Sequence, residues 1–600
     1  MQQSDAALAR PPRNPGIFPL SEVRPGITAT AWTVFQGDTP ESMQVQILGV
    51  MRGARGPGQD LILAQLHGAK AEYAGVVDGM SGSPVYIGNQ LVGSISYRIG
   101  IFSKDPIAGI TPIQQILEVR DFPSSDLTPV DVQTALLDHS ASPPALASTA
   151  SPTSLTAGNM TFQAIETPVV MSGFSPEAIK FWQQKTAGTA LEPVAVGGAL
   201  SAISGSSAPD ALPSAVRATL EPGSAVSMQL VRGDVEVSAT CTVTYIDPTQ
   251  VYACGHPVLG AGPVSLPMTT ADVIATLASP LDAFKIVNTG STIGAFTQDR
   301  ESAIRGTLGA QAHMIPMHVF VDAPGGPRKV NVEILDLPSL TPLAMQVVLL
   351  NSLLQSNENS ETLSYHVTGN VDLAGFPAVP VDVWASAGDP APASIQAAIF
   401  AGDRFSRVYT NSSRRGMIRE INLHVQALSR RVQVTLAEAR LISTDIVHAG
   451  DTIQVEATLR PWQQPERNVR ISVKLPSRLA PGSMRLLVSD AATLDRTLLQ
   501  PRLPATPPDL ATVLAEARDQ HPADRIYVSL LAPETQGELN GQTLTSLPLS
   551  VANALEPLRN QQNAGLNGES AEVAGEAPAG GVLSGFQVLS LHIDPGGGLN

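Results

Sequence analysis

The sequence contains little of what defines several common classes of protein. It has only two cysteines in 600 residues, Cys241 and Cys254, and this number excludes a framework of several disulfides. The two could pair, because they flank one predicted hairpin turn. Two half-buried free thiols are nevertheless the favoured interpretation, since free cysteine is commonly buried. No run of 18 or more apolar residues occurs, so we predict no membrane-spanning helix.

Charge is also scarce, and most of it has one sign. Charged residues make up 15% of the chain, and the formal net charge is −16. Lysine and arginine form no cluster that would indicate a nucleic-acid partner. Spacings typical of metal sites, such as His-x-x-x-His and Cys-x-x-Cys, are absent, so we expect no metal and no other cofactor.

What the sequence does contain favours strands joined by many turns. Hydrophobic residues make up 43% of the chain, with 50 glycines and 49 prolines, and valine and threonine recur in short runs. We therefore predict a mainly β fold of small barrels or sandwiches. Short helices are predicted over residues 175–190, 269–277 and 340–356.

The length corresponds to three to five domains at roughly 100–200 residues each. Strand spacing and changes in composition suggest where they begin and end. The predicted organisation is a loose lead-in (1–17), a β half-barrel with a serine motif (18–125), a linker and insertion (126–220), a β half-barrel with a histidine motif (221–310), a mixed α/β accessory domain (311–428), a β-sandwich domain (429–500) and a C-terminal region (501–600) with a disordered loop over 561–583.

The strongest candidate for chemistry is Ser81, in the run Gly-Met-Ser-Gly-Ser-Pro at 79–84. A nucleophilic serine needs a turn that exposes its hydroxyl, backbone N–H groups for an oxyanion and a base within reach. Gly79 and Gly82 permit such a turn, and the N–H groups of Gly79 and Ser81 can form the oxyanion hole. Ser83 is a weaker nucleophile because it precedes proline. A tight turn without chemistry is the alternative.

His256 is the candidate base, since histidine exchanges protons near neutral pH. It is the only one of ten histidines that lies between a glycine and a proline at the end of a predicted hairpin, beside a loop rich in glycine and proline. His67, which is nearer to Ser81 in the sequence, is the rival. A structural, hydrogen-bonded histidine is the alternative.

A carboxylate that orients the imidazole is harder to identify from the sequence. Asp299 is the first choice, because it follows His256 in the same predicted half-barrel, and Asp282 is the second. Asp78 adjoins the serine turn and is expected to brace it. A Ser–His dyad without an acid also remains open.

These motifs resemble the SpoIVB-type serine peptidases, a trypsin-like, PA-clan-like family. Residues 79–84 match the family's nucleophile motif, and the segment 252–256, Tyr-Ala-Cys-Gly-His, is similar to its histidine element. The order of the two segments is permuted, because the serine segment comes first here. The resemblance implies a two-barrel trypsin-like peptidase core, to which the sequence adds β-sandwich-like accessory domains and a few short helices. It also implies a bacterial cell-envelope or secreted location, although residues 1–15 lack the features of a signal peptide.

The sequence therefore predicts a serine endopeptidase, with Ser81 as the nucleophile and His256 as the general base of an acyl-enzyme mechanism. The expected substrate is a protein or peptide bound as an added strand between the half-barrels, and the accessory β domains could dock protein partners. The main alternative is a catalytically inactive, peptidase-like β scaffold or binding protein of the cell envelope. A non-peptide acyl hydrolase is disfavoured, because Gly-x-Ser-x-Gly is absent at the serine.

Overall fold

The structure is a computed structural model of the 600-residue chain, and it is mainly β. It describes residues 10–99, 105–122, 154–157, 160–187, 189, 191, 193–196, 220–279, 283–355, 363–387, 392–409, 416–443, 446–479, 481–498, 510–532, 535–539, 542–555, 564–567 and 570–594.

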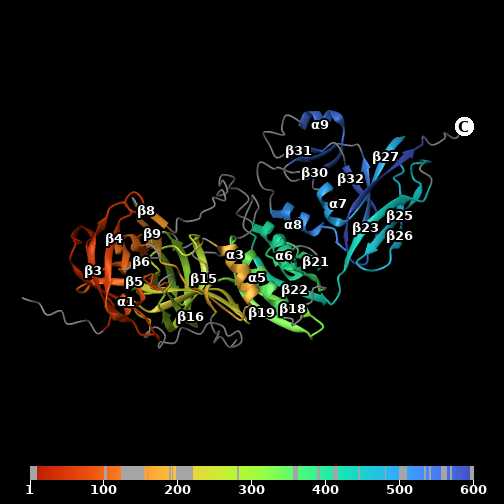
Figure 1. The fold of residues 1–600 in the computed structure, drawn as a ribbon. Helices are drawn as coiled ribbons and strands as arrows, with labels where there is room; N and C mark the ends of the chain where they lie inside the picture. The colour runs from red at the N-terminus through yellow and green to blue at the C-terminus, as the bar shows by residue number, and fades with distance from the viewer. Residues whose placement is uncertain are drawn as a thin grey trace, which may run out of the picture. The chain divides into compact units, whose positions relative to one another are not determined.

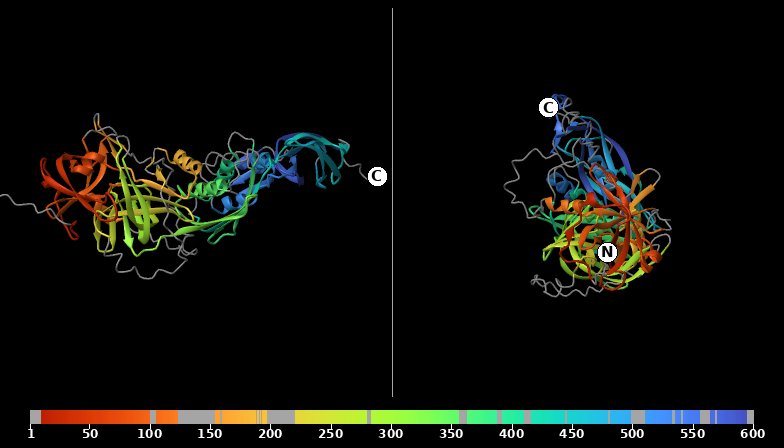
Figure 2. Two further views of the ribbon diagram at one scale, coloured as in Figure 1. Left: turned by 60° about the horizontal axis from the view of Figure 1, so that its bottom comes forward. Right: turned by 90° about the vertical axis from the view of Figure 1, so that its left-hand side faces the viewer.

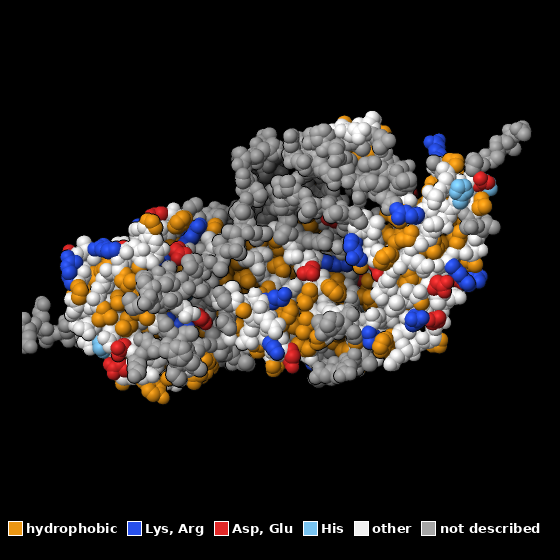
Figure 3. All heavy atoms as spheres, turned by 45° about the horizontal axis from the view of Figure 1, so that its top comes forward, with side chains coloured by type: hydrophobic (Ala, Val, Ile, Leu, Met, Phe, Trp, Pro, Cys, Tyr) orange, Lys and Arg blue, Asp and Glu red, His pale blue; other side chains and the backbone are white. Residues whose placement is uncertain are grey.

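The chain divides into two compact units (Figure 1). The first comprises residues 1–316 and 331–347, and the second comprises residues 317–330 and 348–600. Within the part of the chain that is described, no helix is both long and apolar enough to cross a membrane. On the face drawn in Figure 3, positive and negative side chains are interspersed.

The first barrel is a closed ring of six antiparallel strands, coloured red to orange in Figures 1 and 2. Around the ring the strands are β2 (Thr28–Thr33), β3 (Glu41–Met51), β4 (Leu61–His67), β7 (Ile107–Pro112), β6 (Gln90–Ile99) and β5 (Ser83–Ile87), and β5 pairs again with β2. Alternation fixes which face of a strand is buried. On β3, Met43, Val45 and Ile47 are buried and the glutamines between them are exposed.

The second barrel repeats this closure with longer strands. Its ring consists of β13 (Glu236–Asp247), β14 (Gln250–Ala253), β17 (Ala303–Leu308), β16 (Phe284–Arg300), β15 (Gly262–Leu277) and β12 (Ala225–Gly233), and β12 pairs again with β13. The helix predicted over 269–277 is wrong, because these residues belong to β15. Ala271 and Val273 are buried while Asp272 and Ile274 are exposed, which is the alternation of a strand.

The chain between the barrels adds strands to both of them. β8 (Ser154–Ala157) and β9 (Met160–Ala164) extend the first sheet through the pairing of β9 with β6. β10 (Val169–Ser172) and β11 (Pro193–Val196) extend the second. Helix α3 (Pro176–Thr186) confirms the helix predicted near 175–190. Ser175 caps it by accepting a hydrogen bond from the Ala178 amide at 3.3 Å.

Short elements complete the first unit. They are β1 (Gly16–Ile17), η1 (Leu20–Glu22), α1 (Ala69–Ala74), α2 (Ile113–Leu117) and η2 (Glu118–Asp121). β19 (Arg328–Leu335) pairs with β12. Helix α5 (Thr341–Leu354) confirms the helix predicted over 340–356.

In its described residues the second unit contains a helix-covered sheet, a sandwich and a three-stranded sheet of β30 (Gln542–Leu547), β29 (Thr535–Leu539) and β31 (Ala564–Asn567). In the first sheet β18 (Met314–Asp322), β22 (Ile418–Leu428), β20 (Ser364–Leu373) and β21 (Val379–Ala385) lie side by side, and α6 (Ala393–Tyr409) packs on β20 and β21. The sandwich has one sheet of β26 (Arg467–Lys474), β25 (Thr452–Pro461), β23 (Gln433–Leu441) and β33 (Val582–Ser584). Its other sheet contains β24 (Ile446–Val447), β34 (Phe586–Ile593), β27 (Gly482–Ser489), β28 (Arg525–Ala532) and β32 (Ser570–Pro578).

The sandwich extends beyond the predicted boundary at residue 500. Its hydrophobic core combines Val455 and Ile471 of one sheet with Leu486 and Val528 of the other. The disordered loop predicted over 561–583 is wrong where β32 and β33 lie, because both strands pair within the sandwich. The remaining elements are α7 (Ala491–Leu498), α8 (Leu510–Arg518) and α9 (Leu549–Leu555).

Candidate functional site

Ser81 lies in a tight turn directly before β5 of the first barrel. Gly79 and Gly82 have φ angles of +89° and +95°, which residues with a side chain rarely adopt. The Ser83 amide donates to the Met80 carbonyl at 2.9 Å, and the Gly82 amide donates to the Ile95 carbonyl at 2.8 Å. These bonds fix the turn against β6, so the two glycines explain why the chain can bend sharply here.

The turn is also held by the second barrel. Thr242 on β13 donates its amide to the Ser81 carbonyl at 2.8 Å and its hydroxyl to the Gly79 carbonyl at 2.9 Å. A Cβ atom at Gly82 would overlap the Thr242 carbonyl and the Cys254 amide. The serine turn therefore packs against the hairpin that leads to His256, although the two motifs are far apart in sequence.

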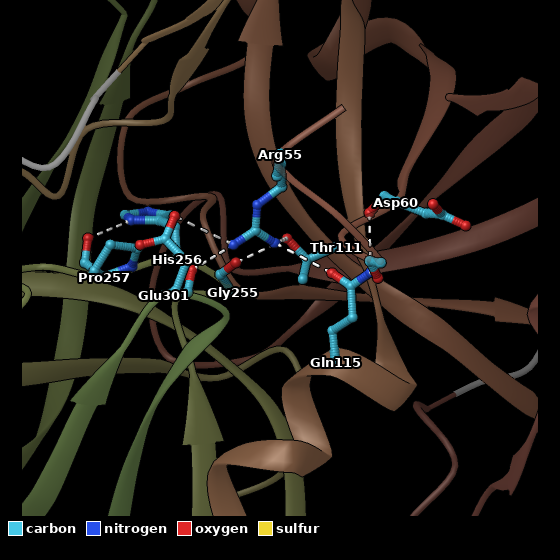
Figure 4. Close-up of polar contacts among 9 residues, drawn as sticks. Arg55, Asp60, Thr111, Gln115, Gly255, His256, Pro257 and Glu301 are labelled. Carbon is cyan, nitrogen blue, oxygen red and sulfur yellow. Dashed lines mark hydrogen bonds and ion pairs between the residues drawn. The ribbon is translucent and has the colours of Figure 1, made fainter. Parts of the chain in front are cut away.

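His256 follows the β13–β14 hairpin and is held from both barrels (Figure 4). Thr111 on β7 donates its hydroxyl to the Gly255 carbonyl at 2.8 Å. A disulfide joins Cys241 to Cys254, two residues before His256. The favoured prediction of free thiols is therefore wrong. The hairpin brings the two cysteines opposite one another, which the sequence alone left open.

The imidazole of His256 is fully buried and its two nitrogens differ. Nδ1 donates to the Pro257 carbonyl at 2.8 Å, since a carbonyl can only accept (Figure 4). Nε2 therefore carries the lone pair, and it has no hydrogen-bond partner among the described residues. Burial lowers the pKa of His256 to about 4, against the opposing effects of the Pro257 and Ile165 backbone.

Arg55 contributes a positive charge near the His256 ring (Figure 4). Its side chain is fully buried, lies 5.3 Å from the Tyr97 ring and donates to the Glu301 carbonyl at 2.6 Å. Its charge also lowers the pKa of His256. Both burial and Arg55 therefore keep the imidazole neutral, which is the form that can accept a proton.

Asp299, the predicted orienting acid, lies on β16 and is buried. Its carboxylate accepts the Val258 amide at 3.0 Å and the Leu259 amide at 2.6 Å. Asp299 therefore braces the loop that follows His256, while the Nδ1 partner of the imidazole is the Pro257 carbonyl. Burial raises the pKa of Asp299 to about 6, although the hydrogen bonds from the loop act in the opposite direction.

Ser81 is fully buried, and its hydroxyl oxygen has no hydrogen-bond partner among the described residues. The Gly79 amide, one of the two predicted oxyanion donors, donates to the Glu166 carbonyl at 3.1 Å. In this conformation the donor is therefore already occupied by the chain itself, and neither Ser81 nor His256 is exposed to solvent.

Two buried charged groups beside the turn were not predicted. Lys285 on β16 donates through Nζ to the Thr33 hydroxyl at 2.8 Å and to the Gly79 carbonyl at 3.2 Å. Arg98 forms an ion pair with Asp78 at 3.2 Å. A lone lysine within a strand gives no sequence signal, because its environment comes from the other barrel. The Asp78 carboxylate accepts hydrogen bonds from Arg98 and from the Glu166 amide, and its expected role in bracing the turn stays a prediction.

The remaining candidates lie elsewhere or have structural contacts. His67 contacts Glu72 at 3.4 Å, and the Ser83 hydroxyl donates to the Met80 carbonyl at 2.6 Å. Asp282 lies outside the described residues. Among the residues that are described, no group of three or more histidine, cysteine or acidic side chains has the geometry of a metal site.

Comparison with known proteins gives no match: no family model, no curated protein and no solved structure is similar to this chain. The resemblance to SpoIVB-type peptidases therefore stays a prediction.

Proposed function

We propose that this protein is a serine hydrolase acting on peptide bonds, with Ser81 as nucleophile and His256 as general base. The SpoIVB-type resemblance of the two motifs suggested these roles. The arrangement of two closed, six-stranded antiparallel barrels in one unit is compatible with a trypsin-like peptidase. In the proposed reaction Ser81 Oγ attacks the substrate carbonyl, His256 Nε2 takes its proton and returns it to the leaving amine, and water releases the acyl group.

The observation that carries the proposal is a pair of unpartnered polar atoms. Ser81 Oγ and His256 Nε2 are both buried without a hydrogen bond among the described residues. Such a group costs about 1–3 kcal/mol, so native structures retain few of them. Backbone bonds connect their segments, from Cys254 to Thr242 at 3.2 Å and from Thr242 to Ser81 at 2.8 Å. Because neither atom has a partner, Ser81 Oγ and His256 Nε2 form no hydrogen bond with each other in this conformation, and the proposed reaction requires them to meet when the site opens.

The tautomer of His256 supports the role of base. Because Nδ1–H donates to the Pro257 carbonyl, the lone pair lies on Nε2. A pKa of about 4 is low for a base that works near neutrality. Burial is the main cause, so we expect this pKa to rise when the site opens to admit a substrate.

The test is covalent labelling with a fluorophosphonate, followed by peptide mapping. We expect the wild-type protein to carry the label on Ser81 and the Ser81→Ala variant to carry none. Ser83→Ala is the matched control, because Ser83 lies two residues away and is the rival nucleophile; it should still be labelled. Label on Ser83, or on neither serine in any variant, would contradict the proposal.

An inactive scaffold is the second candidate, and one observation favours it. No described carboxylate forms a hydrogen bond with the His256 ring, whose Nδ1 partner is the Pro257 carbonyl. A dyad without an acid can still transfer protons, whereas a scaffold cannot react with the probe. The labelling experiment therefore separates the two.

The Cys241–Cys254 disulfide supports an oxidising location, such as the cell envelope or the exterior, for the working protein. This agrees with the location that the resemblance implies. The natural substrate would then be a protein or peptide of that compartment.

A further inference from the structure

Residues Phe162–Glu166, here called the covering segment, lie along the site as an added strand. They include most of β9, which pairs antiparallel with β6 so that Tyr97 faces Ala164 and Arg98 faces Gln163. Beyond β9 the Ile165 amide donates to the Ser96 carbonyl at 2.9 Å. β6 is the strand that also pairs with β5, directly after the serine turn. β5 pairs with residues 90–95 of β6, and the covering segment pairs with β6 from Ser96 onwards. The covering segment thus continues along β6 from the point where β5 begins.

The end of this segment contacts the groups that the proposed reaction needs. The Glu166 carbonyl accepts the Gly79 amide at 3.1 Å, and the Glu166 amide donates to Asp78 at 2.9 Å. The Ile165 backbone acts to raise the pKa of His256. The Glu166 peptide group therefore lies where the proposed oxyanion donor is expected to meet a substrate carbonyl.

The side chains of the segment are anchored in apolar surroundings. Ile165 is fully buried in the same hydrophobic cluster as Val77, Met80 and Ile95. Phe162 is fully buried with Leu61 and Tyr97. An extended main chain with apolar anchors matches the way in which a peptide binds by adding a strand to a sheet.

We propose that the covering segment occupies the place of the substrate, and that the substrate is an extended peptide which pairs with β6 and carries a large apolar residue at the position of Ile165. This inference rests on the proposed function. Ser81 and His256 are fully buried, so the segment must move away before such a peptide can enter. The site is then closed at rest by the protein itself.

The first test loosens the far end of the segment and leaves the serine turn intact. Phe162→Ala removes its aromatic anchor, and we expect fluorophosphonate labelling of Ser81 to become at least tenfold faster than in the wild type. Phe296→Ala is the matched control, because Phe296 is equally buried in the same unit but lies on β16, which has no pairing with β9. Phe162→Leu gives a milder change in the same direction if the alanine variant fails to fold.

The outcomes separate the two proposals. Faster labelling in both Phe162→Ala and Phe296→Ala, or no increase in the Phe162 variants, overturns the covering role while the reactive serine stands. A complete lack of label on Ser81 in the wild type and in the Phe162 variants overturns the proposed function, and this inference fails with it.

The second test concerns the substrate class. A peptide boronic acid with the sequence Phe-Gln-Ala-Ile followed by boronic glutamate reproduces residues 162–166 and places its boron at the position of the Glu166 carbonyl. It is compared with an analogue that carries aspartate in place of the isoleucine. In the Phe162→Ala protein we expect the isoleucine compound to block labelling at a concentration at least tenfold lower. Equal potency, or a preference for the aspartate compound, overturns the assignment of an apolar residue to this position.

Discussion

Lys285 Nζ donates a hydrogen bond to the carbonyl oxygen of Gly79, two residues before the candidate nucleophile. The amine is fully buried, and burial lowers its pKa to about 7. Among the described residues its partners are Thr33 and Gly79, both uncharged, so the amine has no carboxylate to offset the cost of desolvation. A group retained at such a cost beside the serine turn points to a role in holding that turn.

Replacing Lys285 should therefore separate stability from reactivity. Lys285→Met keeps most of the aliphatic stem that packs on Gly79 but removes the buried amine. We expect the free energy of unfolding to stay unchanged or rise by about 1 kcal/mol, as for other buried charges replaced by apolar groups of similar size. The rate constant for labelling of Ser81 at saturating probe should fall about tenfold, with unchanged probe affinity. A parallel loss of stability and labelling would indicate a purely structural lysine.

Protonation of His256 should destabilise the folded protein in acid. The pKa is about 4 in the folded state and 6.5 for an ordinary histidine, so the unfolded chain binds the proton first as the pH falls. The stability is complete above pH 6.5 and declines towards pH 4, by about 3 kcal/mol in all. His256→Gln cannot titrate and should lack this decline.

The comparison must be made between the two proteins, because Asp299 acts in the opposite direction. Its pKa is raised from 3.8 to about 6, so the folded state binds this proton first and gains stability as the pH falls from 6 towards 4. Urea unfolding at several pH values gives the difference between wild type and His256→Gln. A difference that does not change between pH 7 and 4 would contradict the buried, neutral imidazole.

Asp299→Asn should loosen the loop that follows His256. The carboxylate accepts the amides of Val258 and Leu259, and a carboxamide has only one oxygen to accept them. One unpaired buried amide costs about 1–3 kcal/mol, so we expect a loss of about 2 kcal/mol in the free energy of unfolding. Labelling of Ser81 should also become slower. Asp272→Asn, at an exposed position of β15, is the control and should have little effect on either measurement.

Loss of the disulfide should weaken the hairpin before His256. The bridge closes a loop between residues 13 positions apart, and its removal by Cys241→Ala with Cys254→Ala should cost about 3 kcal/mol. Denaturant unfolding measures the change. When the wild-type protein is denatured without a reducing agent, a thiol reagent should detect no free cysteine. Detection of two thiols per chain would disprove the bridge.

Several features of the fold were predictable because they depend on local patterns. Alternating residues such as Met43, Val45 and Ile47 predicted strands, and the sequence around Ser175 predicted helix α3. The failures have physical causes as well. Residues 269–277 of β15 were mistaken for a helix, since a short mixture of alanine, valine and threonine fits both periods until the pairing with β16 is known. The region with β32 and β33 was mistaken for disorder, because its glycines and alanines are stabilised only by pairing in the sandwich.

The amino-acid sequence by itself determined the serine turn, since Gly79 and Gly82 supply the backbone angles that any fold would need there, and it singled out His256 by its neighbours. Only the tertiary structure decided what surrounds them: the Cys241–Cys254 bridge, the amine of Lys285 at the Gly79 carbonyl and the covering segment at the Gly79 amide. These contacts join residues that are distant in the chain. Their energies arise from burial and from hydrogen bonds that exist only after both barrels have closed.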